Sequence, residues 1–152
     1  MAAVVVGGAG FLLAVLWFDL MFDSQVRGHS GGVLPDEVLA SISSYYRRVT
    51  TDAAPMNRFV AVGMIVTLAG IVAQAVVGDL AWGWSAGSAL LAVPPIALAG
   101  TRVVPAAMRL GGRSDEPVVQ SRLARQIYRD HVFCLTSIAL LVVVQAVAAL
   151  TT

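Results

Sequence analysis

Two carboxylates stand four residues apart near the end of the first apolar stretch of the chain. In the segment LWFDLMFD, Asp19 and Asp23 are separated by about one helical turn and therefore share a face of a helix. Asp19 lies within a run of otherwise uncharged apolar residues, and an ionisable side chain in such a run indicates a functional site. Its chemistry could be ion pairing with arginine, metal binding or proton transfer to a ligand.

A second reactive group lies at the start of the last apolar stretch, where His131 and Cys134 are three residues apart. Histidine exchanges protons near neutral pH, so we expect His131 and Asp19 to be the catalytic pair if the protein is an enzyme. Metal sites inside helix bundles also take carboxylate and histidine from facing helices. Candidate metal ligands are therefore His131, Cys134, Asp19 and Asp23, but the sequence identifies no cofactor and no particular metal.

Four apolar stretches carry these residues: 3–22, 59–77, 80–101 and 132–150. Each is long enough to cross roughly 30 Å of hydrocarbon as a helix. The chain has 152 residues, of which 58% are hydrophobic and 12% charged, a composition typical of membrane proteins. We predict an all-α integral membrane protein: a single domain, residues 1–152, folded as an up-and-down four-helix bundle in the lipid bilayer.

The arginines indicate how the bundle is oriented. All ten basic residues are arginine, and they lie in the segments 24–57 and 103–130 or beside them at Arg58 and Arg102. By the positive-inside rule both long loops face the cytoplasm, while both termini face outward. The absence of lysine and the abundance of Ala, Val, Gly and Arg are typical of a GC-rich bacterial genome, so we expect the bacterial inner (plasma) membrane.

Nucleic acid is not an expected partner. Nine acidic residues offset the ten arginines, which leaves a formal net charge of +1. A mixed charged surface of this kind is typical of a solvated, topology-setting face rather than of a nucleic-acid interface.

Two helices are predicted outside the membrane. Pro35 and Asp36 resemble a helix start, and the apolar residues that follow fall on one side of an amphipathic helix over 36–49. We expect this helix to lie on the cytoplasmic surface or to cap the bundle. A second helical pattern runs from Pro117 into the last span, and its first turns would project into the cytoplasm.

Small residues and prolines indicate how the spans pack. Gly83-x-x-x-Gly87 is a helix-contact signature that serves either contacts within the bundle or a homo-oligomer. Pro94 and Pro95 should kink the third span near Ala92. Further glycines in the first two spans should allow close helix approach: Gly7, Gly8, Gly10, Gly63 and Gly70.

Up-and-down topology gathers the polar residues at one end of the bundle. On the cytoplasmic side we expect the reactive pair to meet a ligand-binding or charge network, made of Asp23, Asn57, Arg58, Arg102, Arg129 and Asp130. A purely structural alternative is that Asp19 and Asp23 are neutralised by these arginines, because pairing offsets the cost of a charge in lipid.

Three segments stand in an order that resembles a known family. PMNRF opens the second span, RVVPAAMRLGG leaves the third, and SRLARQIYRDHVF leads through His131 into the fourth. This layout resembles the anthrone-oxygenase-like family of small four-span membrane proteins. The resemblance implies oxidation of an aromatic, polyketide-like substrate with His131 near the site, and it leaves the cofactor unidentified.

Three functions follow as hypotheses. The first is binding of a lipophilic aromatic or quinone-like small molecule at the cytoplasmic end of the bundle, by an oxidoreductase, an oxygenase or a binding protein. The second is a non-enzymatic assembly or scaffold subunit, in which helices 36–49 and 117–130 dock a partner. The third is transport of a small ion or solute, although four spans with one charged end outline no continuous polar path.

Overall fold

The computed structural model describes residues 1–78 and 81–151, so the expected start of the third span at residue 80 lies outside the described residues. The described residues are helical apart from short connections and contain no strand. The α-helices are α1 (Ala2–Asp23), α2 (Asp36–Arg47), α3 (Ala54–Val77), α4 (Trp82–Leu98), α5 (Val104–Gly112) and α6 (Pro117–Thr151). A 3₁₀ turn, η1 (Ser24–Gly28), and two π-helical segments, η2 (Arg48–Asp52) and η3 (Ala99–Val103), extend them.

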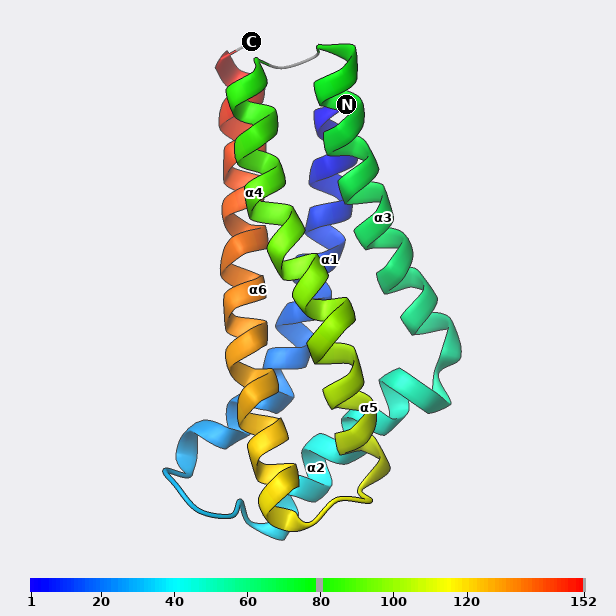
Figure 1. Ribbon diagram of the computed structural model, residues 1–152, viewed down its shortest axis with the longest axis vertical. Helices are drawn as coiled ribbons and strands as arrows, with labels where there is room; N and C mark the ends of the chain where they lie inside the picture. Colours follow the sequence, from blue (N-terminus) through cyan, green and yellow to red (C-terminus); the bar gives the residue numbers. More distant parts are fainter. Residues whose placement is uncertain (79–80, 152) are drawn as a thin grey trace.

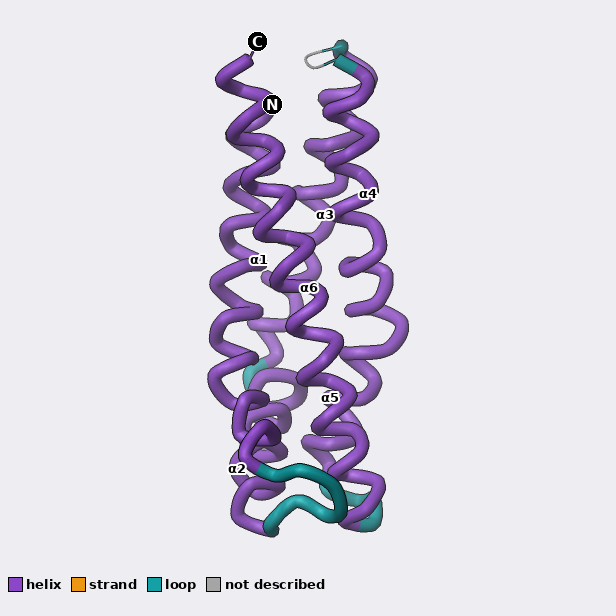
Figure 2. The backbone as a smooth tube through the Cα atoms, turned by 90° about the vertical axis from the view of Figure 1, so that its left-hand side faces the viewer, coloured by secondary structure: helices purple, strands orange, loops and turns teal. Residues whose placement is uncertain are grey.

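Four long helices run beside one another, and both chain termini lie at the same end (Figure 1). Helix α1 packs against α3 and α6, and α4 also packs against α3 and α6, which closes the ring of four. Figure 2 shows α2 and α5 at the opposite end from the termini. Four helical segments are long and apolar enough to span a membrane: Ala2–Gly28, Met56–Val77, Trp82–Gly112 and Pro117–Thr151. The prediction of an all-helical protein with four such helices is confirmed.

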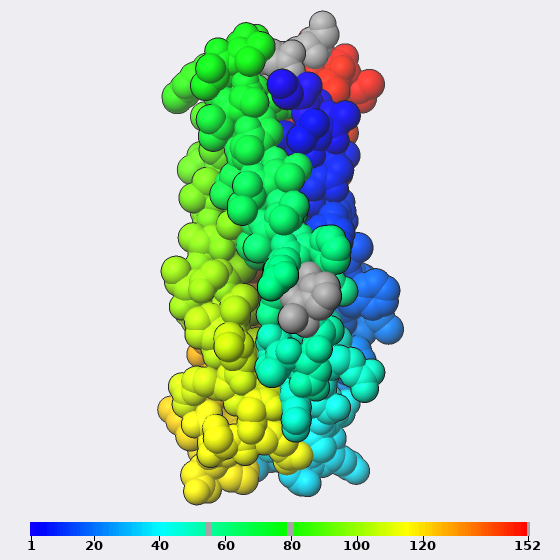
Figure 3. All heavy atoms as spheres, turned by 90° about the vertical axis from the view of Figure 1, so that its right-hand side faces the viewer, coloured from blue at the N-terminus to red at the C-terminus, as the bar shows by residue number. Residues whose placement is uncertain are grey.

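The outward surfaces of the long helices are apolar. Figure 3 shows one face of the molecule, on which α3 lies between α1 and the rod formed by α4 and α5. Large side chains on the outside of the four helices are exposed, as expected for surfaces that contact lipid; they include Trp17, Phe18, Phe59, Ile65, Val72, Leu90, Val143 and Leu150.

Helices α1 and α3 approach closely through glycine. A Cβ atom added to Gly8 would lie 2.5 Å from Oγ1 of Thr67, and one added to Gly70 would lie 2.8 Å from a side-chain carbon of Val5. Gly7 and Gly10 face open space. Of the glycines expected to promote packing in the first span, Gly8 is the one that does so here, because it alone faces α3.

Buried amides connect three helices near the end that carries the termini. The side chains of Gln74 in α3 and Gln145 in α6 donate to each other's carbonyl oxygens at 2.9 and 3.1 Å. Gln145 also donates to the hydroxyl of Ser88 in α4 at 2.8 Å. All three side chains are fully buried. Amides in an apolar interior need such partners, so this cluster fixes how α3, α4 and α6 pack.

Helix α2 caps the other end of the bundle. Its apolar face packs onto α5 and α6 in a core formed by Val38, Leu39, Ile42, Ala106, Leu110, Ala124 and Ile127, among others. A Cβ atom at Gly111 of α5 would lie 2.7 Å from the backbone nitrogen of Arg47, so the two helices touch through their backbones there. The sequence left two positions open for this helix, on the cytoplasmic surface or as a cap on the bundle, and in the structure it is a cap.

The third span is longer than its apolar residues indicated. Helix α4 continues through Pro94 and Pro95, passes into the π-helical η3, and is followed directly by α5. Pro105 stands in the first turn of α5, directly after the π-helical segment. The first part of the expected loop 103–130 is therefore helical, and α6 begins at Pro117 as predicted.

Candidate functional site

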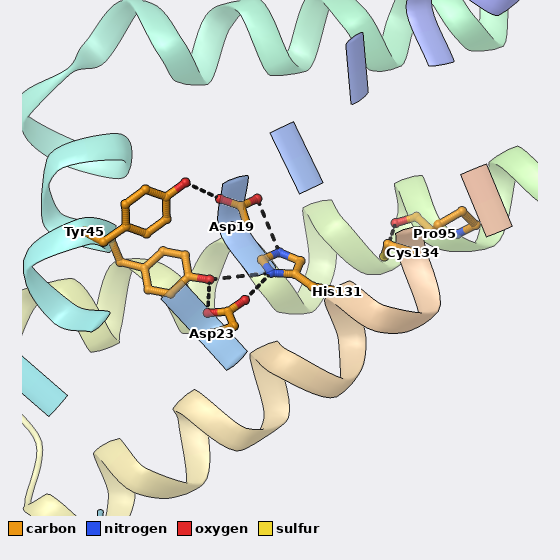
Figure 4. A network of polar contacts seen from close by, with 7 residues as sticks. Asp19, Asp23, Tyr45, Pro95, His131 and Cys134 are labelled. Carbon is orange, nitrogen blue, oxygen red and sulfur yellow. Dashed lines mark hydrogen bonds and ion pairs between the residues drawn. The ribbon is translucent and has the colours of Figure 1, made fainter. Parts of the chain in front are cut away.

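His131 of α6 lies between the two carboxylates of α1. Its Nδ1 atom is 2.6 Å from Oδ2 of Asp23, and its Nε2 atom is 3.8 Å from Oδ2 of Asp19 (Figure 4). Because the carboxylates are one helical turn apart, they reach the two nitrogens of one imidazole ring. The side chain of Asp23 is fully buried, and that of Asp19 is 13% exposed.

Two consecutive tyrosines of α2 complete this group. The Tyr46 hydroxyl donates to Oδ1 of Asp23 at 2.6 Å, and the Tyr45 hydroxyl donates to Oδ1 of Asp19 at 2.6 Å. The Tyr45 ring stacks on Phe22 of α1, with ring centroids 4.1 Å apart. The cap formed by α2 therefore brings a hydrogen-bond donor to each carboxylate (Figure 4).

The hydrogen bonds determine which nitrogen of His131 is free. The single hydroxyl proton of Tyr46 goes to Asp23, so the other oxygen of Asp23 accepts from Nδ1–H of His131. Nε2 is then the nitrogen that faces Asp19 without a hydrogen bond, since 3.8 Å is too long for one. Burial and then the neighbouring carboxylates raise the pKa of Tyr45 and of Tyr46, which keeps both phenols protonated as donors.

A cavity of about 420 Å³ opens from this group into the middle of the bundle. Its polar end carries Asp19, Tyr45, Tyr46 and His131. Most of its lining is apolar and comes from α1, α3, α4, α5 and α6, including Leu12, Leu16, Val60, Met64, Ile96, Val104, Ala107 and Ile138. An apolar cavity with a few converging polar groups is the usual form of a small-molecule site.

Both π-helical segments border the cavity. Val49 and Thr50 come from η2, and Ala99 and Val103 come from η3. Asn57 lies beside η2 on the cavity wall, where its side-chain amide donates to the Thr50 carbonyl at 2.8 Å. Single π-helical turns occur frequently at functional sites, and here two of them shape the same hollow.

The predicted arginines do not neutralise the carboxylate pair. Arg102 forms an ion pair with Asp130, with Nε and Oδ2 2.9 Å apart. Arg58 is exposed on α3 and has no ion-pair partner among the described residues. Arg129 precedes His131 by two residues, about 200° around α6, and therefore points to another side of that helix. The interpretation that arginine pairs with Asp19 and Asp23 is wrong, because His131 and two tyrosines contact them instead.

Cys134 does not join the carboxylates. Its Sγ atom lies 3.7 Å from the carbonyl oxygen of Pro95, on the α4 side of α6 (Figure 4). Within residues 1–78 and 81–151, no group of three or more His, Cys, Asp and Glu side chains is arranged to hold a metal ion. The contacts that the structure shows between His131 and the carboxylates are a hydrogen bond with Asp23 and the 3.8 Å approach to Asp19.

Sequence reasoning missed the two tyrosines. The amphipathic pattern over 36–49 has Tyr45 and Tyr46 on its apolar side, and in the structure Tyr46 is buried and Tyr45 is partly buried. A tyrosine on a buried face needs a hydrogen-bond partner for its hydroxyl, and this requirement could have indicated that both tyrosines belong to a polar site. Their partners could not be identified, because the path of 24–35 between α1 and α2 decides which residues α2 meets.

Comparisons with family models, with curated proteins and with solved structures found no match to this chain.

Proposed function

We propose that this protein binds a lipophilic aromatic or quinone-like molecule in the cavity, with an oxygen of the ligand at His131 and Asp19. The observation that carries the proposal is an apolar cavity of about 420 Å³ that ends in a buried imidazole held between two carboxylates. A flat hydrophobic ring system matches the apolar walls, and a hydroxyl or carbonyl oxygen matches the polar end.

The polar end is suited to moving a proton. Asp23, supported by Tyr46, accepts from Nδ1 of His131 and orients the ring, so that Nε2 can take a proton from an acidic hydroxyl of the ligand and return it. Asp19 lies next to Nε2 and can stabilise the imidazolium that forms. Oxidation of an aromatic substrate, the activity implied by the resemblance to the anthrone-oxygenase-like family, would use such a base to remove the proton and would need an oxidant such as dioxygen to take the electrons.

The proposed setting is the bacterial inner membrane, with the four long helices as an up-and-down bundle. The arginines support this orientation, because all ten lie in or beside the segments at the α2 and α5 end, opposite the termini. By the positive-inside rule that end is cytoplasmic. The polar end of the cavity then lies close to the cytoplasmic edge of the membrane.

A scaffold function is less well supported. The helices expected to dock a partner are α2 and the first turns of α6, and their apolar faces pack against each other and against α5. Val38, Ile42 and Ile127 are at most 8% exposed, so little of this apolar surface is left for another protein.

The test is binding of 2-naphthol and of naphthalene to the purified full chain in mild detergent, measured by calorimetry. Ala99 lines the cavity and Ala97 lies on the exposed side of the same helical rod. We expect Ala99→Leu to fill the cavity and weaken binding of both probes at least tenfold, while Ala97→Leu changes it less than twofold. Equal effects of the two variants would count against the cavity as the binding site.

A second comparison isolates the polar end. His131→Gln should weaken binding of 2-naphthol several-fold and leave naphthalene unchanged, since only the first probe presents a hydroxyl to the imidazole. Loss of both probes to the same extent would instead mean that His131 acts only in folding. The absorption spectrum and metal content of the same preparation identify any cofactor that purifies with the protein.

A further inference from the structure

A second cavity, of about 770 Å³, lies between the segment that follows α1 and the first turns of α6. Figure 1 shows this segment looping out beside the lower part of α6. The lining contains no acidic residue among those described, and it includes four arginines and a histidine: Arg27, His29, Arg122, Arg125 and Arg129. It shares no lining residue with the cavity at His131.

One arginine builds the wall of this cavity. Arg125 donates to the carbonyl oxygens of Gly32 at 2.8 Å, Gly31 at 3.1 Å and His29 at 3.3 Å. Gly31 and Gly32 have φ values of +77° and +66°, a backbone conformation that allows the chain to curve around the guanidinium. The wall is therefore held by Arg125, whose charge is already hydrogen-bonded.

The other three arginines are not neutralised by any of the residues that the structure describes. Arg27, Arg122 and Arg129 have no hydrogen-bond or ion-pair partner among the described residues, and all three are exposed. The described aspartates have other partners. Asp19 and Asp23 contact His131 and the two tyrosines, and the other aspartates form ion pairs with arginines outside this cavity: Arg47, Arg102, Arg109 and Arg113. Three guanidinium groups thus surround a hollow that lacks a counter-charge.

The rim of the cavity indicates which anion it suits. Val33 and Val118 are 50% and 60% exposed beside the arginines, and Tyr128 also lines the hollow. Arg129 stands three residues before the apolar stretch 132–150 of α6, which is the depth expected for lipid headgroups when that stretch crosses a membrane. One guanidinium group can bind two phosphate oxygens through parallel N–H donors. The exposed apolar side chains next to the arginines match the glycerol and acyl part of a lipid.

We propose that this cavity binds the phosphate group of an anionic phospholipid on the cytoplasmic side of the membrane. Basic pockets beside membrane-spanning helices on that side are suited to such headgroups. A free phosphate ion or a soluble phosphate ester offers the same charge without the apolar part. This inference does not depend on the ligand proposed for the cavity at His131.

The experiment measures lipid binding to the full chain in mild detergent by native mass spectrometry. Dioleoylphosphatidylglycerol is the anionic probe, and dioleoylphosphatidylcholine is the neutral reference. The test variant is Arg122→Gln with Arg129→Gln. Its matched control is Arg48→Gln with Arg58→Gln, which removes the same charge from exposed arginines outside the cavity.

We expect the wild type to bind the anionic lipid at least tenfold more tightly than the neutral one. The Arg122/Arg129 double variant should lose this preference, while the Arg48/Arg58 variant keeps it within twofold. Equal loss in both variants would overturn the proposal, because binding would then follow net charge alone. Glycerol 1-phosphate or inorganic phosphate binding as tightly as the lipid would overturn the assignment to a lipid.

A further variant separates this proposal from the proposed ligand site. Ala99→Leu, which fills the other cavity, should leave the preference for phosphatidylglycerol unchanged. Loss of the preference in that variant would mean that both cavities depend on one fold-wide change, and the assignment of a separate lipid site would fail.

Discussion

His131 is held more tightly on one side than on the other. Its Nδ1 atom contacts Asp23 at 2.6 Å, whereas Nε2 is 3.8 Å from Asp19. Asp23 is the more buried carboxylate, although the sequence suggested that it belongs to the charged edge of the membrane and that Asp19 lies deeper. The reason is the cap, because α2 covers Asp23 with Tyr46. We therefore assign Asp23 to orienting the imidazole and Asp19 to the cavity.

Removing the Tyr46 hydroxyl should destabilise the protein. Tyr46→Phe leaves a buried carboxylate oxygen of Asp23 without its donor, and we expect a loss of about 1–3 kcal/mol in the free energy of unfolding. Tyr128→Phe is the control, because no hydrogen bond of the Tyr128 hydroxyl is present among the described residues. Denaturant unfolding in detergent micelles measures both variants, and equal stabilities would contradict the role of this hydrogen bond.

The contribution of Tyr46 has a defined pH range. Burial and then Asp23 raise the pKa of Tyr46 well above the ordinary tyrosine value of 10.0. A group whose pKa is raised on folding stabilises the protein fully below its unfolded-state pKa, and the stabilisation is lost as pH rises through the folded-state pKa. The difference between wild type and Tyr46→Phe should thus be constant from neutral pH to about pH 9 and shrink only at higher pH.

At the scale of helices, the length of the apolar stretches predicted the four long helices but not the short helix α5. The four long helices were predictable because each contains some twenty apolar residues. Helix α5 was not expected, because Arg109 and Gly111 made its segment read as a polar loop, yet its packing against α2 buries Ala107 and Leu110. The site was half predictable: Asp19 and His131 stand out in apolar runs, whereas Tyr45 is a site residue only through the path of α2.

The contact between α2 and α5 depends on the absence of a side chain. Gly111→Ala would place a Cβ atom 2.7 Å from a backbone nitrogen of α2, which a rigid helix cannot avoid. We expect a loss of about 1–3 kcal/mol in the free energy of unfolding. Gly112→Ala is the matched control, because its nearest neighbour would be a side-chain oxygen at 4.0 Å. Thermal unfolding in detergent compares the two, and a stable Gly111→Ala variant would show that α2 can move away.

For the whole molecule, the two ends differ in charge, and the proposed orientation is testable. Ser30 lies in the loop near α6 and Ala81 lies at the opposite end, and both are exposed. The native Cys134 is buried. In intact cells, a membrane-impermeant maleimide should label Ala81→Cys and not Ser30→Cys. Labelling of Ser30→Cys from outside would reverse the orientation, and labelling of both would exclude four simple crossings.

The cluster of Gln74, Gln145 and Ser88 has a consequence for how protons can move through the bundle. The described buried side chains between His131 and the end with the termini are apolar or are neutral amides and hydroxyls, apart from the thiol of Cys134. We therefore expect protons that reach His131 to enter and leave from its own end of the bundle. Reconstituted liposomes should then hold a pH gradient as long as empty ones do, and a faster loss of the gradient in liposomes that contain the protein would contradict this expectation.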